Sequence, residues 1–169
     1  MQSLIDKVKE DERKMRKADL RLLQEQIQPH FLYNTLDSII WMAEGKKYED
    51  VVLMTASLAR LLRQSISNED ETVLIGQEIQ YVKSYLTIQK MRYKDKLEFA
   101  INVDPSINSV HIVKLVLQPI VENAIYHGLK YKESKGMLTV NGYQKDGNAV
   151  IEIADDGVGM DEETLNRIF

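Results

Sequence analysis

The first 67 residues carry two runs of apolar side chains at helical spacing, separated by one short break at Glu44-Gly45. Positions three and four apart lie on one face of a helix, so each run predicts a helix with a single apolar stripe. We expect one long helix over residues 1 to about 44 and a second over about 49–67. The expected stripe positions are Leu20, Leu23, Ile27, Leu32, Leu36, Ile39 and Ala43, then Val51, Met54, Leu58, Leu61, Leu62 and Ile66.

The break itself predicts a tight helical hairpin. Gly45 can adopt the left-handed conformation that commonly ends a helix, so two antiparallel helices joined by a short loop are expected. A lone hairpin cannot cover both apolar stripes. We therefore expect it to pair with a second copy of the chain into a four-helix bundle.

An acidic segment, Asn68-Glu69-Asp70-Glu71, interrupts the helical pattern, and we place a boundary there between domains 1–68 and 69–169. Beyond it, alternating apolar segments between helical ones predict a mixed α/β layer, so the fold class is α+β. Lys145-Asp146-Gly147-Asn148 is a hairpin turn signal. The expected elements are helices over 76–93 (inner face Ile79, Val82, Leu86, Gln89) and 111–129, strands over 97–103, 137–143 and 149–154, a glycine loop at 155–160 and a helix from 161.

Composition excludes several classes of function. A net charge of −4 and a pI near 5.5 argue against nucleic-acid binding, and the absence of cysteine excludes disulfides and thiolate chemistry. No apolar stretch is long enough to span a bilayer and the N-terminus lacks a secretion signal, so we expect membrane attachment only through a missing N-terminal part. The abrupt end at Phe169 is interpreted as a cut inside a larger domain.

The first chemical motif is Gln28-Pro29-His30-Phe31-Leu32-Tyr33-Asn34. Proline inside a helix removes a hydrogen bond and clashes with the carbonyl four residues earlier, here that of Glu25, at a cost of about 3 kcal/mol. A kinked or loosened helix is therefore expected beside His30. His30 and Asn34 are four residues apart and share a face, where a neutral imidazole is a competent nucleophile and Asn34 can hold the ring or a water. A histidine that only packs or faces solvent is the alternative.

The second motif is the helical segment Leu117-Gln118-Pro119-Ile120-Val121-Glu122-Asn123-Ala124-Ile125-Tyr126-His127-Gly128. Asn123 and His127 share a polar face beside an apolar stripe, which suits a nucleotide pocket. The Asn123 amide oxygen is a suitable ligand for Mg²⁺, and Lys130 can lie near the phosphates. An amphipathic helix with ordinary exposed polar residues is the alternative. The expected buried face is Leu117, Ile120, Val121, Ala124 and Ile125.

The third motif, Asp155-Asp156-Gly157-Val158-Gly159-Met160, ends a strand in a carboxylate and two glycines. Glycines permit close backbone approach and positive φ, and a fixed carboxylate can accept a hydrogen bond from the exocyclic amine of adenine. The segment lacks the lysine of a phosphate-binding Walker loop and the full dinucleotide pattern. A tight turn after an edge strand is the alternative.

Together and in this order, the motifs resemble the sensor histidine kinases of two-component systems, in particular the LytS/YesM-type branch. The first resembles the phosphoacceptor box. Glu122-Asn123-Ala124 with His127-Gly128 resembles the asparagine box, and the third motif resembles the first glycine box. Ile88-Gln89-Lys90-Met91-Arg92-Tyr93 is also similar to that branch, and the resemblance covers about residue 15 to the end.

The resemblance implies a homodimeric helical hairpin followed by the α/β sandwich that gyrase, mismatch-repair and chaperone ATPases share (the GHKL type). It implies that ATP phosphorylates His30 and that the phosphate then passes to an aspartate of a response regulator. Asn34 would position a water that removes this regulator phosphate. The implied nucleotide-site residues are Asn123 for Mg²⁺, His127 and Lys130 beside it, Asp155 for the adenine amine, and Gly157 and Gly159 around the adenine.

Three departures from the family pattern qualify these expectations. Phe31 stands where many of these kinases have an acidic general base, for which Glu25 is the candidate here, and Tyr126 stands where they often have lysine. The chain stops before the second glycine box and most of the ATP lid, so we expect it to bind ATP poorly and to autophosphorylate weakly.

Competing functions are disfavoured by particular residues. A hydrolytic ATPase of this superfamily would have glutamate at the position of Pro119, and a serine-directed kinase would not need the Pro29-His30 hairpin. A non-catalytic dimerisation and signalling module remains the alternative.

Overall fold

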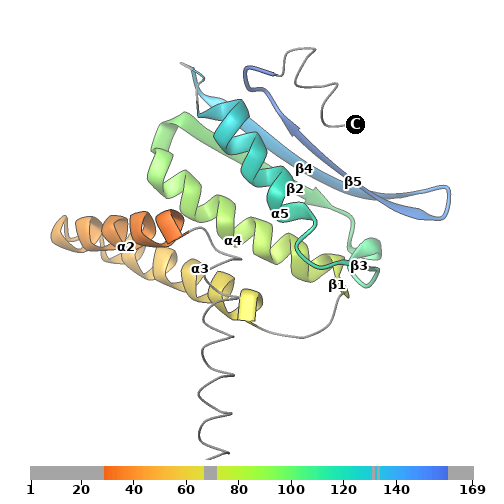
Figure 1. Ribbon diagram of the computed structural model, residues 1–169, viewed down its shortest axis with the longest axis horizontal. Coiled ribbons are helices and arrows are strands. Elements are labelled where there is room, and N and C mark those ends of the chain that lie inside the picture. Colours follow the sequence, from red (N-terminus) through yellow and green to blue (C-terminus); the bar gives the residue numbers. More distant parts are fainter. Residues whose placement is uncertain (1–28, 67–71, 131, 133, 160–169) are drawn as a thin grey trace, which may run out of the picture. The chain divides into compact units, whose positions relative to one another are not determined.

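The computed structural model describes residues 29–66, 72–130, 132 and 134–159 (Figure 1). The chain divides into two compact units, Met1–Asn68 and Glu69–Phe169. The helix expected before residue 29, the kink at Pro29 with the Glu25 carbonyl, and the helix expected from residue 161 all lie outside the described residues.

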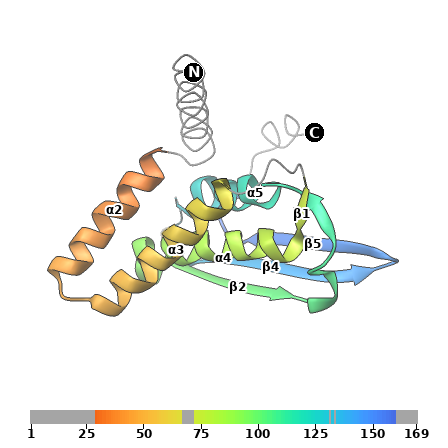
Figure 2. The same ribbon diagram turned by 90° about the horizontal axis from the view of Figure 1, so that it is seen from below.

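The first unit contains the helical hairpin, with α2 over Pro29–Glu44 and α3 over Tyr48–Ile66. Two helices joined by a short loop were expected, and α2 packs against α3 (Figures 1 and 2). The apolar stripe of α3 is confirmed at Met54, Leu58 and Leu61, which are buried. In the single chain α2 buries Phe31, Thr35 and Met42, while Leu36 and Ala43 of the expected stripe are exposed and would need a second copy to cover them.

The loop of the hairpin differs from expectation by one residue. Lys46, with φ 57°, takes the left-handed conformation that was expected at Gly45. The Lys47 N–H donates to the Met42 carbonyl at 2.9 Å and the Lys46 N–H to the Ala43 carbonyl at 3.0 Å. These two bonds form a Schellman motif in which Gly45 is the capping residue and Lys46 follows it. The α2 helix ends at Glu44, as expected, and only the left-handed residue is shifted by one position.

The second unit begins with a short strand and a long helix and then builds a small sheet. The strands and helices expected over 76–93, 97–103, 137–143 and 149–154 are all confirmed. The observed elements are β1 Thr72–Leu74, α4 Ile75–Tyr93, η1 Lys94–Lys96, β2 Leu97–Val103, η2 Pro105–Ile107, β3 His111–Val113, α5 Leu117–Asn123, η3 Ala124–Leu129, β4 Gly136–Lys145 and β5 Asn148–Asp155.

The main sheet has three strands in the order β2-β4-β5. β2 pairs parallel with β4 in the register Leu97↔Gly136, and β4 pairs antiparallel with β5 through the predicted turn. In that turn Asp146 and Gly147 both have positive φ, at 51° and 80°, as a type I′ hairpin turn requires. The α4 and α5 helices lie on the same side of this sheet (Figure 2), which gives a two-layer α/β unit.

The core of the second unit lies between the helices and the sheet. The inner face of α4 is confirmed, with Ile79, Val82, Leu86 and Gln89 all buried. Alternate residues of β4, including Leu138 and Val140, are fully buried, as expected for a strand with one covered face. The fold is therefore α+β, with the last turn of the asparagine-box helix seated against the ends of β4 and β5.

The helix expected over 111–129 is wrong in its first third. His111–Val113 form β3, which pairs antiparallel with β1, and the α-helix begins only at Leu117. From Ala124 to Leu129 the helix widens into a π-helix, where the Lys130 N–H donates to the Ile125 carbonyl at 2.9 Å. Local π-helix is rare and is often found at functional sites.

Candidate functional site

His30 is exposed in the first turn of α2, and Asn34 follows it one turn later. The amide Nδ2 of Asn34 lies 2.9 Å from Nδ1 of His30 and 3.2 Å from Nε2. The two side chains share a face and touch, as their spacing predicts. Trp41, two turns beyond Asn34, is also exposed and holds the Lys47 ammonium 5.5 Å from the centre of its ring.

Asn123 and His127 are both exposed, at the end of α5 and within the π-helix. The inner face of this helical run is confirmed at Leu117, Val121, Ala124 and Ile125, which are buried. Ile120 was placed on that face wrongly: it is 48% exposed. Ile120 lies three residues before Asn123, so its side chain belongs to the outer face that carries the polar residues.

A partly buried group of polar side chains lies on α4, α5 and the π-helix. The Gln89 amide donates to the Tyr85 hydroxyl at 2.7 Å, and the Gln118 amide donates to the Glu122 carboxylate at 2.6 Å. Burial, reinforced by neighbouring Tyr126, raises the pKa of Tyr85, and burial also raises the pKa of Glu122. Tyr126 shares a hydrogen bond with Tyr85. It therefore belongs to this inner group.

The start of α5 is held by a buried carboxylate on α4. Glu78 is 4% exposed, and its two oxygens accept hydrogen bonds from the backbone N–H groups of Leu115 at 2.9 Å and Leu117 at 3.3 Å. Leu115 has φ 59°, an unfavourable conformation for leucine. A carboxylate near a helix N-terminus satisfies unpaired donors and complements the helix dipole. Glu78 thus fixes where the asparagine-box helix begins.

The glycine box meets the π-helix at Gly128. The Val158 N–H donates to the Gly128 carbonyl at 3.1 Å, and the Gly157 N–H donates to Oδ1 of Asp155 at 2.9 Å. A Cβ on Gly157 would lie 2.4 Å from the carbonyl carbon and oxygen of Gly128, so only glycine fits there. Gly159 has a different reason to be glycine, a φ of 73° with open space around it.

The adjacent carboxylates Asp155 and Asp156 have different partners. Oδ1 of Asp156 accepts from the Met137 N–H at 2.7 Å, and Oδ2 pairs with the Lys132 ammonium at 2.7 Å. Lys132, and after it the Met137 N–H, hold the pKa of Asp156 below its usual range. Asp156 therefore ties the glycine box to the start of β4 and leaves Asp155 exposed beside the π-helix.

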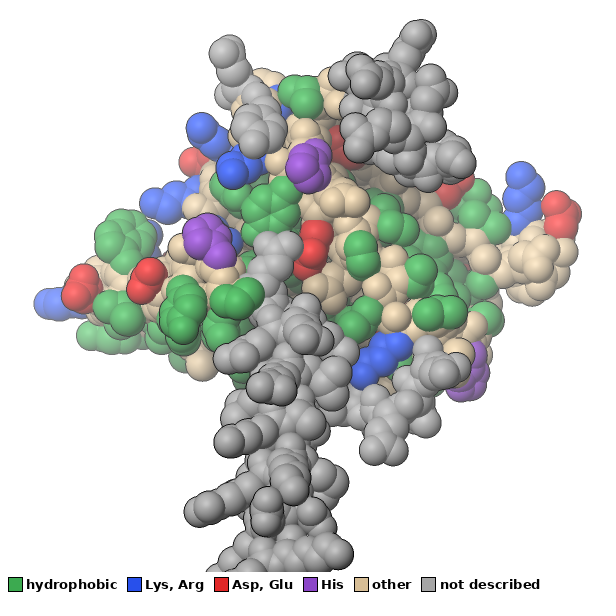
Figure 3. Space-filling view, in the orientation of Figure 1, with side chains coloured by type: hydrophobic (Ala, Val, Ile, Leu, Met, Phe, Trp, Pro, Cys, Tyr) green, Lys and Arg blue, Asp and Glu red, His purple; other side chains and the backbone are tan. Residues whose placement is uncertain are grey.

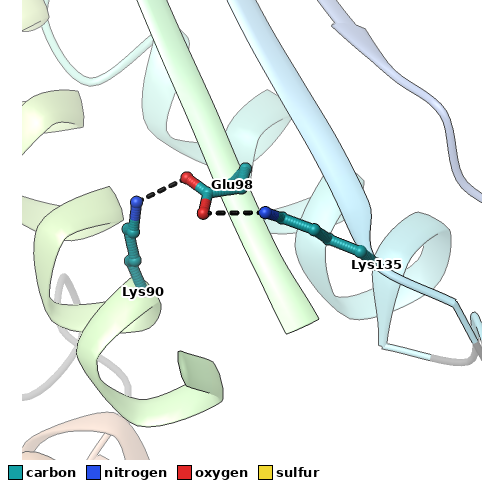
Figure 4. Close-up of polar contacts among 3 residues, drawn as sticks. All are labelled: Lys90, Glu98 and Lys135. Carbon is teal, nitrogen blue, oxygen red and sulfur yellow. Dashed lines mark hydrogen bonds and ion pairs between the residues drawn. The ribbon is translucent and has the colours of Figure 1, made fainter. Parts of the chain in front are cut away.

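A second ionic contact anchors the segment between the asparagine box and β4. Glu98 on β2 lies between Lys90 of α4 and Lys135, whose ammonium is 3.0 Å from Oε1 of Glu98 (Figure 4). The hydrogen bonds from Lys90 and then Lys135 lower the pKa of Glu98. Lys132 and Lys135 thus fix two points of the segment that links the asparagine box to the sheet.

The structure brings together one part of the sequence-predicted nucleotide site. Asp155 and Gly157 lie against Gly128, and His127 is next to that contact in the chain, while Asn123 lies earlier in the same helical run. Lys130 is exposed, with its ammonium 6.0 Å from the centre of the Tyr126 ring.

Sequence reasoning assigned no role to four residues that shape this site. They are Glu78, Gly128, Lys132 and Asp156. Gly128 and Asp156 stand inside the quoted boxes, so a signal was present for them. Nothing in the local sequence marks Glu78 or Lys132, because their partners are 37 and 24 residues away, at Leu115 and Asp156.

Two absences apply to the described part of the chain. Within it, no three His, Asp or Glu side chains cluster closely enough to hold a metal ion. In the same residues, no helix combines the length and apolar character needed to cross a membrane.

Comparison with known families assigns both units. Residues 18–97 match the family described as "Histidine kinase", and residues 109–169 match the family described as "Histidine kinase-, DNA gyrase B-, and HSP90-like ATPase". Both units therefore match families that include histidine kinases, and the second unit carries an ATP-binding region of the ATPase type.

Individual relatives narrow the similarity to one branch. The chain is 37% identical over 151 residues to sensor histidine kinase YesM of Bacillus subtilis, 33% over 154 residues to sensor protein LytS of Oceanobacillus iheyensis, and 34% over 154 residues to sensor histidine kinase YpdA of Escherichia coli. These matches cover 89%, 89% and 90% of this chain and 26%, 26% and 27% of the relatives. The chain thus spans about a quarter of the length of these curated relatives.

Proposed function

We propose that this chain is the phosphoacceptor hairpin and part of the ATP-binding region of a sensor histidine kinase, with His30 as the residue that ATP phosphorylates. The observation that carries the proposal is the exposed His30 ring in contact with Asn34. It stands in one chain with a glycine box seated on an asparagine box. The family match and the three relatives support the same function.

The contact with Asn34 explains how the imidazole can be prepared as a nucleophile. When the Asn34 amide turns its oxygen toward the ring, it accepts the Nδ1–H of His30, and this leaves the lone pair on Nε2. Nε2 then attacks the γ-phosphorus of ATP, so that the N–P bond forms as the P–O bond to ADP breaks. Asn34 therefore orients the ring in a chain where Phe31 stands in place of the acidic general base of many of these kinases.

The second unit offers donors and acceptors that fit an adenine nucleotide. Asp155 presents an exposed carboxylate to an exocyclic amine. Beside it, the backbones of Gly157 and Gly128 meet without side chains between them. The exposed Asn123 amide oxygen would hold Mg²⁺ together with the phosphates, since Mg²⁺ prefers oxygen ligands and keeps several waters. His127 and Lys130 would lie beside the nucleotide.

Labelling with ATP that carries a labelled γ-phosphate, in the presence of Mg²⁺, tests the proposal. We expect the full-length protein to acquire an acid-labile, alkali-stable label that His30→Ala abolishes. His111→Ala, which changes an exposed histidine on β3, is the matched control and should keep the label. Label retained in His30→Ala would exclude His30 as the phosphorylated residue. No label under conditions where ATP binds would favour the non-catalytic signalling module instead.

The same Asn34 side chain supports a second role in removing phosphate from the response regulator. An amide within hydrogen-bonding distance of the phosphoacceptor ring is placed to orient a water toward a phosphoaspartate brought to His30. Regulator dephosphorylation by the full-length kinase and its Asn34→Ala variant would be compared, with Ser38→Ala as a control on the same helix. An unchanged rate in Asn34→Ala would exclude this role.

The partners follow from the same proposal. A receiver domain with an acceptor aspartate would dock on the hairpin at His30, and a second copy of the chain would complete the helical bundle. Attachment to a membrane would come through sequence that precedes the hairpin. We further propose that the two compact units are the functional domains, 1–68 for dimerisation and phosphotransfer and 69–169 for nucleotide binding.

A further inference from the structure

Gly128 is buried in the π-helix, where this helix meets the end of β5. A side-chain carbon on Gly128 would lie 2.4 Å from Oδ1 and 3.0 Å from Cγ of Asp155. Non-bonded heavy atoms of this kind prefer a separation of about 3.5 Å or more. The Asp155 carboxylate therefore occupies the space that a side chain at position 128 would fill.

The carboxylate is held in that space from the other side. Oδ1 of Asp155 accepts the Gly157 N–H at 2.9 Å, and the Gly128 carbonyl accepts the Val158 N–H at 3.1 Å. Gly128 thus supplies both the gap for the carboxylate and the acceptor that anchors the next turn of the glycine box. Two boxes separated by 27 residues meet at this one position.

We propose that Gly128 is a positioning residue for nucleotide recognition: its missing side chain sets the direction in which the Asp155 carboxylate points toward the adenine amine. This inference rests on the proposed function, in which Asp155 binds that amine. Gly128 does not have the positive φ that would make glycine necessary for backbone reasons. Position 128 needs glycine because the Asp155 carboxylate fills the space that a side chain would take.

An alanine at position 128 should leave the fold in place and displace the carboxylate. The nearest atoms to the added carbon belong to the end of the Asp155 side chain, which can rotate away. Alanine at position 157 is different, since its Cβ would meet the Gly128 backbone at 2.4 Å and the turn itself would have to move. Gly128→Ala therefore changes the direction of the Asp155 carboxylate without moving the turn.

The test compares binding of ATP with binding of inosine triphosphate, which has a carbonyl oxygen in place of the adenine amine. Equilibrium binding would be measured on the full-length protein and on Gly128→Ala, Asp155→Ala and the double variant. Gly45→Ala is the control, because Gly45 lies in the loop of the helical hairpin and an added Cβ would meet its nearest atom, the Trp41 carbonyl oxygen, at an ordinary 3.4 Å.

We expect Gly128→Ala to weaken ATP binding at least about tenfold, the loss of one hydrogen bond to a charged group. Its affinity for inosine triphosphate should stay within about twofold, well below one hydrogen bond's contribution. The double variant should bind ATP no more weakly than Asp155→Ala, because both changes act on one carboxylate. Gly45→Ala should change neither affinity.

Equal weakening of both nucleotides by Gly128→Ala, unchanged preference for ATP, or a further loss in the double variant would each overturn the inference. If Gly128→Ala does not fold, recovery of folding in the double variant would support a conflict with the carboxylate, and failure to recover would overturn it. A wild-type protein without preference for ATP, or an Asp155→Ala variant that keeps the preference, would instead refute the adenine role of Asp155.

Discussion

Glu122 is a carboxylate held where burial opposes its charge, next to the asparagine of the asparagine box. Burial raises its pKa, although the hydrogen bond from Gln118 works in the opposite direction. A carboxyl group whose pKa is raised by folding stabilises the protein fully only below its unfolded pKa, about 4.3 for glutamate. This stabilisation is lost as pH rises through the folded pKa, so at neutral pH the charged group opposes folding.

We therefore predict that Glu122→Gln raises the melting temperature at pH 7.5 and that the gain disappears near pH 4. Glutamine keeps an oxygen that can accept the Gln118 hydrogen bond without a charge to desolvate. Thermal unfolding at several pH values measures the effect. Asp95→Asn, the same chemical change at an exposed position of the same unit, should show no such gain. Equal melting temperatures at pH 7.5 would contradict the prediction.

The α5 helix depends on a contact that its own sequence does not provide. No side chain at its N-terminus makes a cap, and the buried Glu78 carboxylate of α4 accepts two backbone hydrogen bonds there instead. The position of Asn123, at the other end of the same short helix, therefore depends on α4. Packing between α4 and α5 reinforces this dependence.

Glu78→Ala should lower the free energy of unfolding by about 3 kcal/mol, because it leaves two backbone donors without a charged acceptor. Glu78→Gln should cost about 1 kcal/mol, since one oxygen remains. Denaturant unfolding measures both, and hydrogen exchange should show lost protection at Leu115 and Leu117. Gln77→Ala, which removes an exposed hydrogen bond to the Leu74 N–H, is the control and should cost under about 1 kcal/mol. A similar cost for Gln77→Ala and Glu78→Ala would exclude the special role of Glu78.

Sequence patterns identified the long elements and failed on the short ones. The β1 and β3 strands have three residues each, too few for alternation to show, and they exist because they pair with one another across 36 or more residues. For that reason the predicted helix over 111–129 wrongly included the residues of β3. One local signal did mark the true start, since Pro119 is tolerated only in the first turn of a helix.

In the candidate site too, contacts within one element were predictable from the sequence and contacts between elements were not. Spacing alone predicted the contact of His30 with Asn34, because both lie on one helix. The contact of Gly128 with Asp155 joins a helix to the end of a strand, and it depends on the sheet register. Motif resemblance named the residues of both boxes, but which glycine makes room for which group is visible only in three dimensions.

At the scale of the molecule, the hairpin unit leaves much of its apolar surface uncovered. The exposed apolar residues on it are Tyr33, Leu36, Ile40, Trp41, Tyr48, Val52 and Leu53. Apolar side chains gather over the region of α2 and α3 in the space-filling view (Figure 3). Tyr33, Leu36 and Ile40 follow helical spacing on the face of α2 opposite the buried Phe31 and Thr35. Exposed apolar patches of this kind commonly mark protein–protein interfaces.

We therefore predict that the chain is a dimer held together by the outer faces of α2 and α3. Ile40 and Val52 are 57% and 67% exposed in the single chain, and each should contribute about 1.5–3 kcal/mol when a partner buries it. The double variant Ile40→Glu/Val52→Glu should raise the dimer dissociation constant at least about a hundredfold, because a dimer would have to bury the new charges.

Sedimentation velocity across a concentration series measures the dissociation constant, and circular dichroism checks that the helices persist. Gln144→Glu adds a negative charge on the exposed end of β4, outside the hairpin, and should leave the dimer intact. If the Ile40→Glu/Val52→Glu protein stayed dimeric, the copies would have to associate through another surface. If instead the variant is monomeric, its labelling shows which chain is phosphorylated. Loss of the phosphate label on His30 would indicate that each ATP-binding unit acts on its partner's histidine, whereas retained label would indicate transfer within one chain.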